Sequence, residues 1–216
     1  MGIISPFLDL LFPPKCIFCA KVLHKAEDSL CEKCIESLPY TDYGGKQEGE
    51  YFDYCISALY YKDSVRKSLL RFKFRNAALY ANTYGMMLAE CISGHPDIQY
   101  DLISWVPLSL KRKRTRGYDQ AMLLAYATAL NLGAVAVETL AKQLDVQAQS
   151  DLSAIAERRA NISGAYQAID EELIDGKCIL LIDDIITTAS TLSECAKVLL
   201  EAGASRVICA TLARGE

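Results

Sequence analysis

Histidine is scarce in this chain of 216 residues, where only His24 and His95 occur. That scarcity disfavours Ser–His–Asp triads, histidine-rich metal sites and histidine general bases. No apolar run reaches the length of a membrane span. The first basic residue is Lys15, so the amino-terminal stretch lacks the charged region of a signal peptide. With nine cysteines, an odd number, and no export signal, we expect a cytoplasmic protein whose thiols stay reduced.

The overall composition favours a folded α/β protein without a global nucleic-acid signature. The net charge is −4, and 51% of the residues are hydrophobic, which is enough for a sizeable core and argues against disorder. The length suits one α/β domain with a small appendage.

A short apolar run ends in two adjacent carboxylates. Residues 177–182 read KCILLI, without alternation, which is typical of a strand buried on both faces of a parallel sheet. Asp183 and Asp184 follow, then a hydroxyl-rich loop at residues 187–191, a helical pattern and a further strand at residues 206–212. The pattern predicts a strand, an acidic turn, a loop, a helix and a strand in that order.

This unit has the chemistry of a sugar-phosphate site. Ligands of open parallel sheets bind beyond the carboxyl ends of the strands, and a helix N-terminus offers free N–H groups to a phosphate. The two acids would accept hydrogen bonds from ribose hydroxyls while the loop holds the 5′-phosphate. The predicted site comprises Asp183, Asp184, Thr187, Thr188, Ala189, Ser190 and Thr191. The alternative is that the acids and threonines only cap the helix.

A second candidate segment follows the strand predicted at residues 102–106. Pro107, Leu108 and Ser109 lead into five cations within six positions, namely Lys111, Arg112, Lys113, Arg114 and Arg116. Cations just beyond a strand end would neutralise a pyrophosphate leaving group. A basic surface turn is the alternative.

Four cysteines near the amino terminus have metal-ligand spacing. Cys16, Cys19, Cys31 and Cys34 form a CxxC–x11–CxxC pattern, which predicts a closed, structural Zn²⁺ site. Two disulfides or unpaired core thiols are the alternatives. The polar, turn-rich residues 39–50 suggest a boundary, with an arm and zinc module at residues 1–45 and the main domain at residues 46–216.

Two further segments carry candidate functional residues. A helix predicted at residues 62–74 is strongly basic, and Phe72 and Phe74 interleave with Arg71, Lys73 and Arg75. Basic side chains beside stacking rings suit single-stranded nucleic acid, with Lys67, Arg71 and Lys73 as the candidate contacts. A solvated basic face is the alternative. Residues 140–166 are polar and weakly periodic and include Arg158 and Asn161. They would form either a mobile lid over substrate or an ordinary helical insertion.

At the level of motifs, ILLIDDIITTAST resembles the phosphoribosyl pyrophosphate (PRPP) motif of type I phosphoribosyltransferases. Ala189 stands where that motif usually carries glycine, the residue unstrained at positive φ. Taken in order, the cysteine pairs, LLRFKF, VPLSLKRKRTRGYDQ, QSDLSAIAERRANISGAY and LLIDDIITTAST resemble the blocks of the ComF family over nearly the whole chain.

The resemblance implies a type I phosphoribosyltransferase fold, a parallel sheet flanked by helices, with an N-terminal zinc module. It further implies that Asp183 and Asp184 bind the ribose and residues 187–191 the 5′-phosphate. Residues 107–109 with Arg112 and Arg116 would bind pyrophosphate, and residues 158–161 would belong to a flexible loop. Asp119 stands where the family often has asparagine.

Two functions follow from the resemblance. One is an enzyme that binds Mg²⁺–PRPP and transfers the phosphoribosyl group to a nucleophile. The other is a non-catalytic protein that handles single-stranded DNA in natural competence, with the same pocket sensing PRPP or gripping a phosphate backbone. Fold alone does not decide between them.

Overall fold

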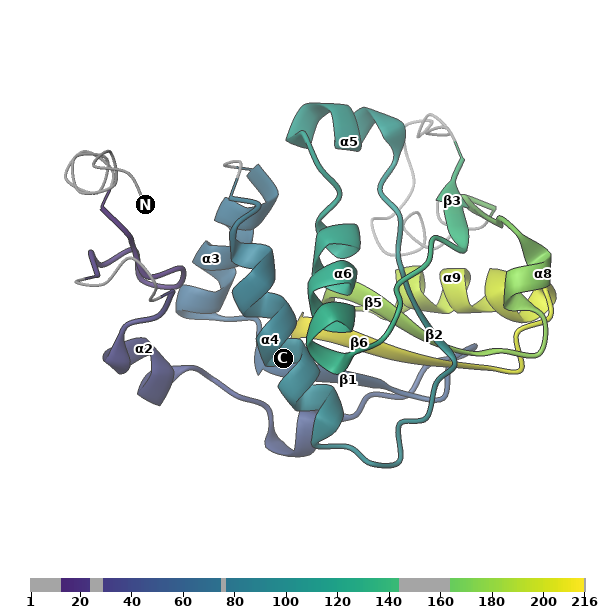
Figure 1. Cartoon of the computed structure of the whole chain (residues 1–216), viewed down its shortest axis with the longest axis horizontal. Helices are drawn as coiled ribbons and strands as arrows, with labels where there is room; N and C mark the ends of the chain where they lie inside the picture. The colour runs from purple at the N-terminus through teal and green to yellow at the C-terminus, as the bar shows by residue number, and fades with distance from the viewer. Residues whose placement is uncertain (1–12, 24–28, 75–76, 144–163, 216) are drawn as a thin grey trace.

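A computed structural model describes residues 13–23, 29–74, 77–143 and 164–215 of the chain. Its centre is a four-stranded parallel sheet with the order β1-β6-β5-β2 (Figure 1). The strands are β1 Cys55–Tyr60, β2 Leu102–Trp105, β5 Cys178–Ile186 and β6 Arg206–Arg214. The sequence predictions for the amino-terminal arm and for Arg158 and Asn161 concern residues outside the described part.

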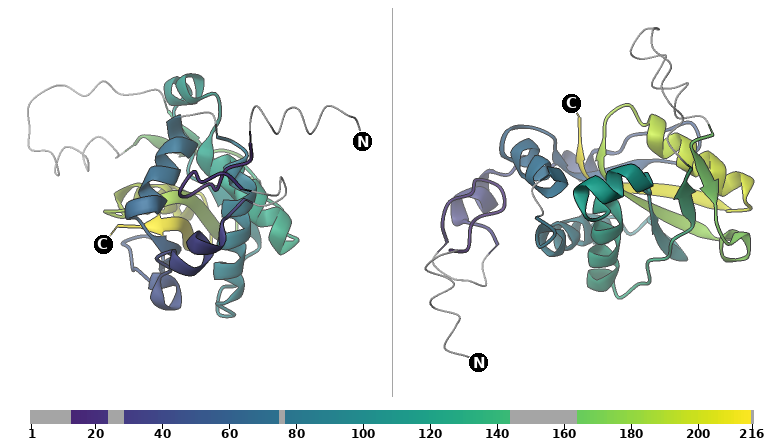
Figure 2. Two further views of the ribbon diagram at one scale, coloured as in Figure 1. Left: turned by 90° about the vertical axis from the view of Figure 1, so that its left-hand side faces the viewer. Right: turned by 90° about the horizontal axis from the view of Figure 1, so that it is seen from above.

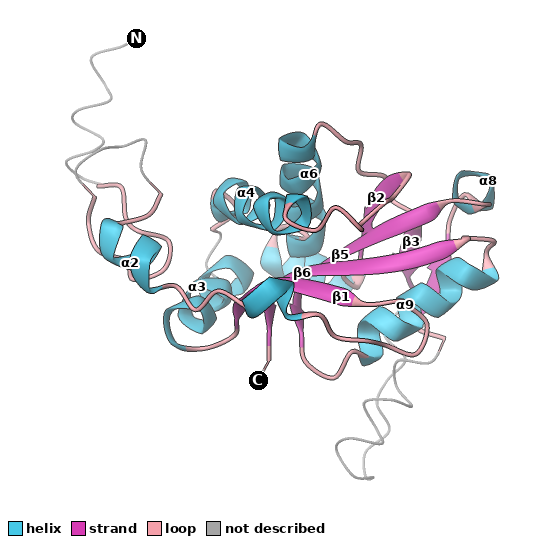
Figure 3. Cartoon of the chain, turned by 90° about the horizontal axis from the view of Figure 1, so that it is seen from below, coloured by secondary structure: helices cyan, strands magenta, loops and turns pink. Residues whose placement is uncertain are grey.

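Helices cover both faces of the sheet (Figure 3). One face carries α3 Asp63–Phe74, α4 Tyr80–Ser93 and α6 Gln120–Leu132. The other carries α9 Ser190–Glu201, the short α8 Glu171–Ile174 and the antiparallel pair β3 Leu140–Lys142 and β4 Tyr166–Ala168. The remaining elements are α2 Glu32–Ser37, the 3-10 turn η1 Asp42–Gly45 and α5 Leu110–Arg116.

Strand β5 is apolar on both sides because it separates two cores. Leu180 and Ile182 belong to the core under α3, α4 and α6, whereas Ile179 and Leu181 belong to the core under α9. Successive side chains of a strand point to opposite faces, so a strand covered on both faces loses the polar alternation of a half-exposed one. The uninterrupted apolar run is explained by this position.

The strands and helices predicted from the sequence are largely found in the structure, with two differences. Strand β5 continues through both aspartates to Ile186, because its pairing with β6 persists as far as the Ile186–Arg214 pair. Asp183 and Asp184 therefore lie within the final part of the strand instead of after it. The basic residues 111–116 form the helix α5 instead of a turn, and Figure 1 shows α5 projecting beyond α6.

The N-terminal module packs on α3 at one end of the molecule (Figure 2). Arg71 of α3 donates hydrogen bonds to the carbonyl oxygens of Ile17 at 2.6 Å and Phe18 at 2.7 Å. Phe18 is buried against Tyr84 of α4, with ring centroids 6.0 Å apart. The module thus shares its apolar core with the helices, while the division at residue 45 stays a prediction.

Helices α4 and α6 approach each other closely at Gly85. A Cβ atom built at Gly85 would lie 2.4 Å from Cβ of Ala127, 2.6 Å from its carbonyl carbon and 2.8 Å from the nitrogen of Thr128. Contacts to backbone atoms cannot be relieved by a side-chain rotation. Glycine is therefore required at this position, and the two helices are fixed at this spacing.

We expect Gly85→Ala to lower the free energy of unfolding by about 1–3 kcal/mol, since the new methyl group overpacks the contact. Thermal or urea denaturation followed by circular dichroism measures the change. Asn82→Ala on the exposed side of α4 is the matched control and should stay within about 0.5 kcal/mol of the parent. An unchanged stability for Gly85→Ala would contradict the close approach.

Candidate functional site

The two segments singled out by the sequence meet in one open cleft of about 340 Å³. Strand β5 and the loop after it form one wall, and the β2–α5 turn with α5 forms another. Of the residues expected at the site, those that line the cleft are Pro107, Leu108, Arg112, Arg116, Asp183, Asp184, Thr187 and Thr191. The acids and the arginines, nearly seventy residues apart in sequence, are thus brought together at the carboxyl edge of the sheet.

The two acids differ in their surroundings. Asp184 is buried, and both of its carboxylate oxygens contact the ammonium nitrogen of Lys73, Oδ1 at 2.9 Å and Oδ2 at 2.8 Å. Asp183 accepts a hydrogen bond from the backbone N–H of Asp184 at 2.7 Å. Burial and then the neighbouring charge of Asp184 raise the pKa of Asp183 to about 8. Asp184 is therefore paired with a cation, whereas Asp183 holds its proton more strongly.

The hydroxyl loop leads into α9, and no side chain among the described residues caps the backbone N–H groups at the start of this helix. Ala189 precedes the helix with φ 58° and ψ −7°. Thr188, Ala189 and Ser190 line a small hollow of about 30 Å³ with Thr187 and Asp183. The capping alternative fails here, because neither acid caps α9.

The conformation of Ala189 explains why glycine is usual at this position. A left-handed backbone costs an L-residue roughly 1–2 kcal/mol through the contact of Cβ with the carbonyl oxygen. The chain accepts this strain and keeps the loop conformation that the motif requires.

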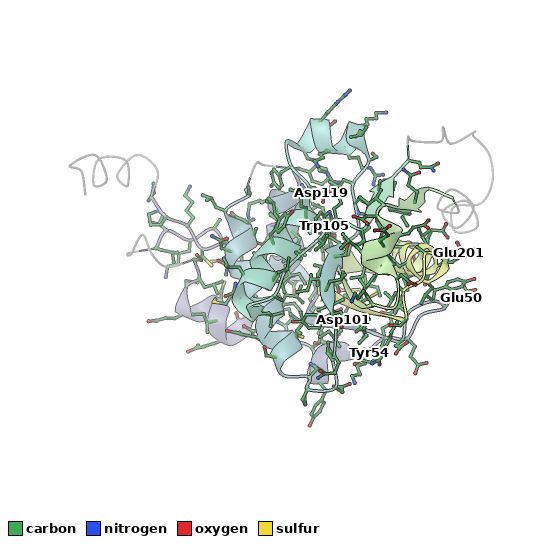
Figure 4. All side chains as sticks on the ribbon, turned by 45° about the vertical axis from the view of Figure 1, so that its right-hand side comes forward. Glu50, Tyr54, Asp101, Trp105, Asp119 and Glu201 are labelled. Carbon is green, nitrogen blue, oxygen red and sulfur yellow. The ribbon has the colours of Figure 1, made fainter. Side chains whose placement is uncertain are left out.

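The arginine-bearing segment is fastened to the body by Asp119. This buried carboxylate accepts hydrogen bonds from the backbone N–H of Leu108 at 2.8 Å and from that of Met122 at 3.2 Å. It therefore joins the turn before α5 to the start of α6. Figure 4 shows Asp119 between α5 and Trp105, the last residue of β2. The N–H of Leu108 is engaged by Asp119, and the hydroxyl oxygen of Ser109 accepts from the N–H of Arg112 at 3.4 Å.

The two arginines of the cleft are held to different degrees. Arg116 donates to Oε1 of Gln120 at 2.7 Å and lies over the ring of Phe74 at 5.0 Å. Burial lowers its pKa, while the charge of Asp184 opposes that shift. Arg112 is exposed on α5 and lines the cleft from outside. Arg116 is therefore a fixed charge, and Arg112 is free to reorient toward a ligand.

Among the cleft residues that sequence reasoning missed are Lys142 and Tyr166. They face each other across β3 and β4, with Nζ of Lys142 3.0 Å from the Tyr166 hydroxyl and 4.7 Å from the ring centroid. Burial raises the pKa of Tyr166 far above its ordinary value. The available signal was the position of these residues at the two ends of the polar segment 144–163, where paired strands would close the loop.

The three residues expected to contact nucleic acid have different environments on α3. Lys67 is exposed. Arg71 is bound to the carbonyl groups of the N-terminal module, and Lys73 is bound to Asp184 in the cleft. The sequence pattern gave no indication of this separation, because each partner lies on a distant segment.

The four N-terminal cysteines form a ligand set for zinc. Their sulfur atoms all lie within 4.8 Å of one another, with Cys19 and Cys31 3.6 Å apart. A tetrahedral ion with Zn–S bonds of about 2.3 Å separates its sulfurs by roughly 3.8 Å, which matches this cluster. All nine cysteines are free of disulfides, so the disulfide alternative is wrong for this structure.

The protein environment already favours a thiolate at Cys16. Burial alone would raise its pKa, but the backbone N–H groups of Cys19, Cys31 and Phe18 bring it down to about 7. The other five cysteines lie outside the cluster. Cys55, Cys195 and Cys209 are fully buried, whereas Cys91 and Cys178 are half-buried.

Comparison with known proteins gives the class. Residues 125–216 match the phosphoribosyl transferase domain, and residues 7–52 match the double zinc ribbon domain. Together with the helix-flanked parallel sheet and the four clustered cysteines, these matches define a phosphoribosyltransferase-type domain preceded by a zinc ribbon. No helix among the described residues has the length and apolarity to span a membrane.

A relative that covers nearly the whole chain shows the family. Competence protein F of Haemophilus influenzae is 30% identical over 222 residues, which cover 93% of this chain and 96% of that protein. Competence protein ComFC of Bacillus subtilis is 30% identical over 66% of this chain and 56% of its own length. A ribose-phosphate pyrophosphokinase of Ralstonia nicotianae is 36% identical over 55% of this chain and 35% of that protein. The chain belongs to the ComF family.

We expect elemental analysis of the purified protein to return about one zinc per chain, because four thiolates complete one closed site. Cys19→Ser should abolish this zinc content, since Cys19 is exposed and its replacement removes one ligand without opening the core. Cys91→Ser lies outside the cluster and is the control. Full zinc retention in Cys19→Ser would contradict the four-sulfur site.

Proposed function

We propose that this protein binds PRPP, or another phosphorylated ribose, in the cleft and transfers the phosphoribosyl group to an acceptor. The observation that supports the proposal is that acidic and hydroxyl groups lie on one side of the cleft and arginines lie on the other. Asp183 and Asp184 with the loop at residues 187–191 lie on one side, and Arg112 and Arg116 lie on the other. Such an arrangement suits a ligand with hydroxyl groups at its middle and phosphates at both ends.

Each part of the ligand has a matching part of the cleft. The carboxylates accept from the ribose hydroxyls, and the open start of α9 with Thr187 and Thr191 holds the 5′-phosphate. The pyrophosphate lies toward Arg112, Arg116 and Lys142. Because the N–H of Leu108 and the hydroxyl of Ser109 are engaged internally, side chains of α5 bind the pyrophosphate more than the turn itself does.

In the transfer, the bond between C1 of the ribose and the pyrophosphate oxygen breaks, and a lone pair of the acceptor forms the new bond to C1. The leaving pyrophosphate keeps the electron pair of the broken bond, so cations at its position stabilise the developing charge. Carboxylate oxygens are suitable donors for Mg²⁺, which would supply further neutralisation of the pyrophosphate when bound with PRPP.

We expect the double substitution Asp183→Asn with Asp184→Asn to weaken PRPP binding at least a hundredfold, because each residue loses a carboxyl oxygen that would accept from a ribose hydroxyl. Titration calorimetry with PRPP and Mg²⁺ measures the affinity, and circular dichroism checks the fold. The matched control removes two exposed acids, Glu172→Gln with Glu201→Gln, on the distant ends of α8 and α9 (Figure 4 labels Glu201). An unchanged affinity for PRPP in the aspartate variant would contradict the proposed binding site at Asp183 and Asp184.

Turnover is tested separately by release of pyrophosphate from PRPP in the presence of candidate bases and amines. Release that depends on an acceptor supports the transferase. Binding without release favours the second candidate function, handling of single-stranded DNA without catalysis.

One observation favours that second candidate. Helix α5 presents Lys111, Lys113 and Arg114 to solvent beside the cleft, and the ring of Phe74, 64% exposed, lies next to Arg116. Cations beside an exposed ring suit a single strand, which binds through its phosphates and by stacking. Two relatives are named competence proteins. The originally expected Arg71 and Lys73 are engaged inside the protein, so α5 is the better candidate surface.

We expect Lys111→Ala, Lys113→Ala and Arg114→Ala together to reduce the salt dependence of oligo(dT) binding. Each lost phosphate contact lowers the slope of log K against log salt by about 0.7, so three contacts account for a change of about 2. Fluorescence anisotropy at several salt concentrations measures the slope, and Lys67→Ala tests the exposed member of the α3 set. Absence of binding at low salt would remove this second function.

A further inference from the structure

The ammonium group of Lys73 occupies the position of a cation at the carboxylate pair. Its nitrogen contacts both oxygens of Asp184, at 2.9 and 2.8 Å. The Lys73 side chain is only 20% exposed and that of Asp184 only 10%. Both residues line the cleft together with Asp183. A positive charge is therefore built into the ribose-binding end of the site before any ligand or metal ion arrives.

The helix that carries Lys73 is fixed on two sides. Phe72 is fully buried and packs edge-on against Tyr84 with ring centroids 5.3 Å apart, and the hydroxyl of Tyr118 donates to the carbonyl of Phe72. Arg71 binds the carbonyl groups of Ile17 and Phe18 in the N-terminal module. The contacts of Arg71 and Phe72 thus hold the backbone at Lys73 in place. The packing of α3, and not only the charge of Asp184, therefore sets the position of the ammonium group.

Charge balance in the cleft supports the same conclusion. Lys73, Arg112, Arg116 and Lys142 line it against two carboxylates. The charge of Lys73 opposes the shift that burial and Asp184 impose on the pKa of Asp183. An ammonium group donates three hydrogen bonds. Since two oxygens of Asp184 accept from it, its third N–H direction is available to a hydroxyl oxygen of a bound sugar.

We propose that Lys73 takes the place of a divalent cation at the sugar hydroxyls, so that the cleft binds ribose 5-phosphate without a divalent cation. This inference rests on the proposed function of the cleft and names Lys73 as its positioning residue. The ammonium group of Lys73 at Asp184 leaves Mg²⁺ with a role only toward the pyrophosphate end of a PRPP ligand.

Ribose 5-phosphate is the appropriate probe, because it lacks the pyrophosphate that itself chelates Mg²⁺. Calorimetric titrations in EDTA and in millimolar Mg²⁺ would compare the parent protein with Lys73→Ala, Lys73→Arg and Lys177→Ala. Lys177 is exposed at the opposite end of the strand β5 region and matches the change in charge. Thermal denaturation of each variant checks that it is folded.

We expect the parent and Lys177→Ala to bind with dissociation constants that differ less than threefold between EDTA and Mg²⁺. Lys73→Ala should lose at least tenfold in EDTA and regain most of that loss in Mg²⁺, and Lys73→Arg should keep binding in EDTA. A purely structural role for Lys73 would lower both affinities equally, and that result overturns the inference.

The remaining outcomes separate this inference from the proposed function. If the parent binds ribose 5-phosphate in Mg²⁺ but not in EDTA, Lys73 does not replace the cation, while the sugar-phosphate site stands. If the parent binds in neither condition, the proposed function fails and the inference fails with it.

Discussion

The structure depends on the placement of two adjacent carboxylates at the carboxyl end of β5, Asp184 buried and Asp183 half-buried. Ionised acids in a partly dry site are costly unless cations lie against them. Lys73 satisfies Asp184 directly, and the charge of Arg116 interacts with the same acid, while Asp183 responds through a raised pKa. These cations come from α3 and α5, so those helices must pack where their charges reach β5. The acid pair thereby determines which elements surround the cleft.

This requirement gives α3 a double role. Lys73 reaches the cleft, and Arg71, two residues earlier, binds the carbonyl groups of Ile17 and Phe18 between the first pair of cysteines. Residues two apart on a helix point in widely different directions, so one helix contacts both the zinc ribbon and the site. The zinc ribbon stabilises the position of α3 and, through it, that of the ammonium group at Asp184. In this structure the ribbon is therefore part of the support of the cleft.

A feature of the site could be predicted from the sequence where the interacting residues lie close together along the chain. The acids, the hydroxyl loop and the cysteine pairs are local patterns. The four cysteine sulfurs cluster as expected, whereas the acids lie in the last part of β5 instead of after it. The division of roles on α3 was not visible, because the partners of Arg71 and Lys73 lie 53 or more residues away. The same holds for Lys142 and Tyr166, which meet only through the β3–β4 pairing. Asp119 was noted as a departure from the family pattern, yet its part in fastening α5 depends on the geometry of the folded turn.

Some side chains of the cleft are fixed before a ligand binds and others are free to move. This difference indicates which of them contribute to binding and which to catalysis. An interaction formed equally with substrate and transition state improves affinity without raising the rate of the chemical step. The Lys73–Asp184 pair exists before a ligand arrives, and ribose hydroxyls change little in charge during transfer, so this end of the cleft contributes mainly to binding. In the proposed transfer, the charge would develop on the pyrophosphate, toward Arg112 and Arg116. Arg112 is exposed on α5, and Asp119 holds the turn before this helix. The rate of the proposed transfer therefore depends on how closely α5 brings Arg112 to the leaving group.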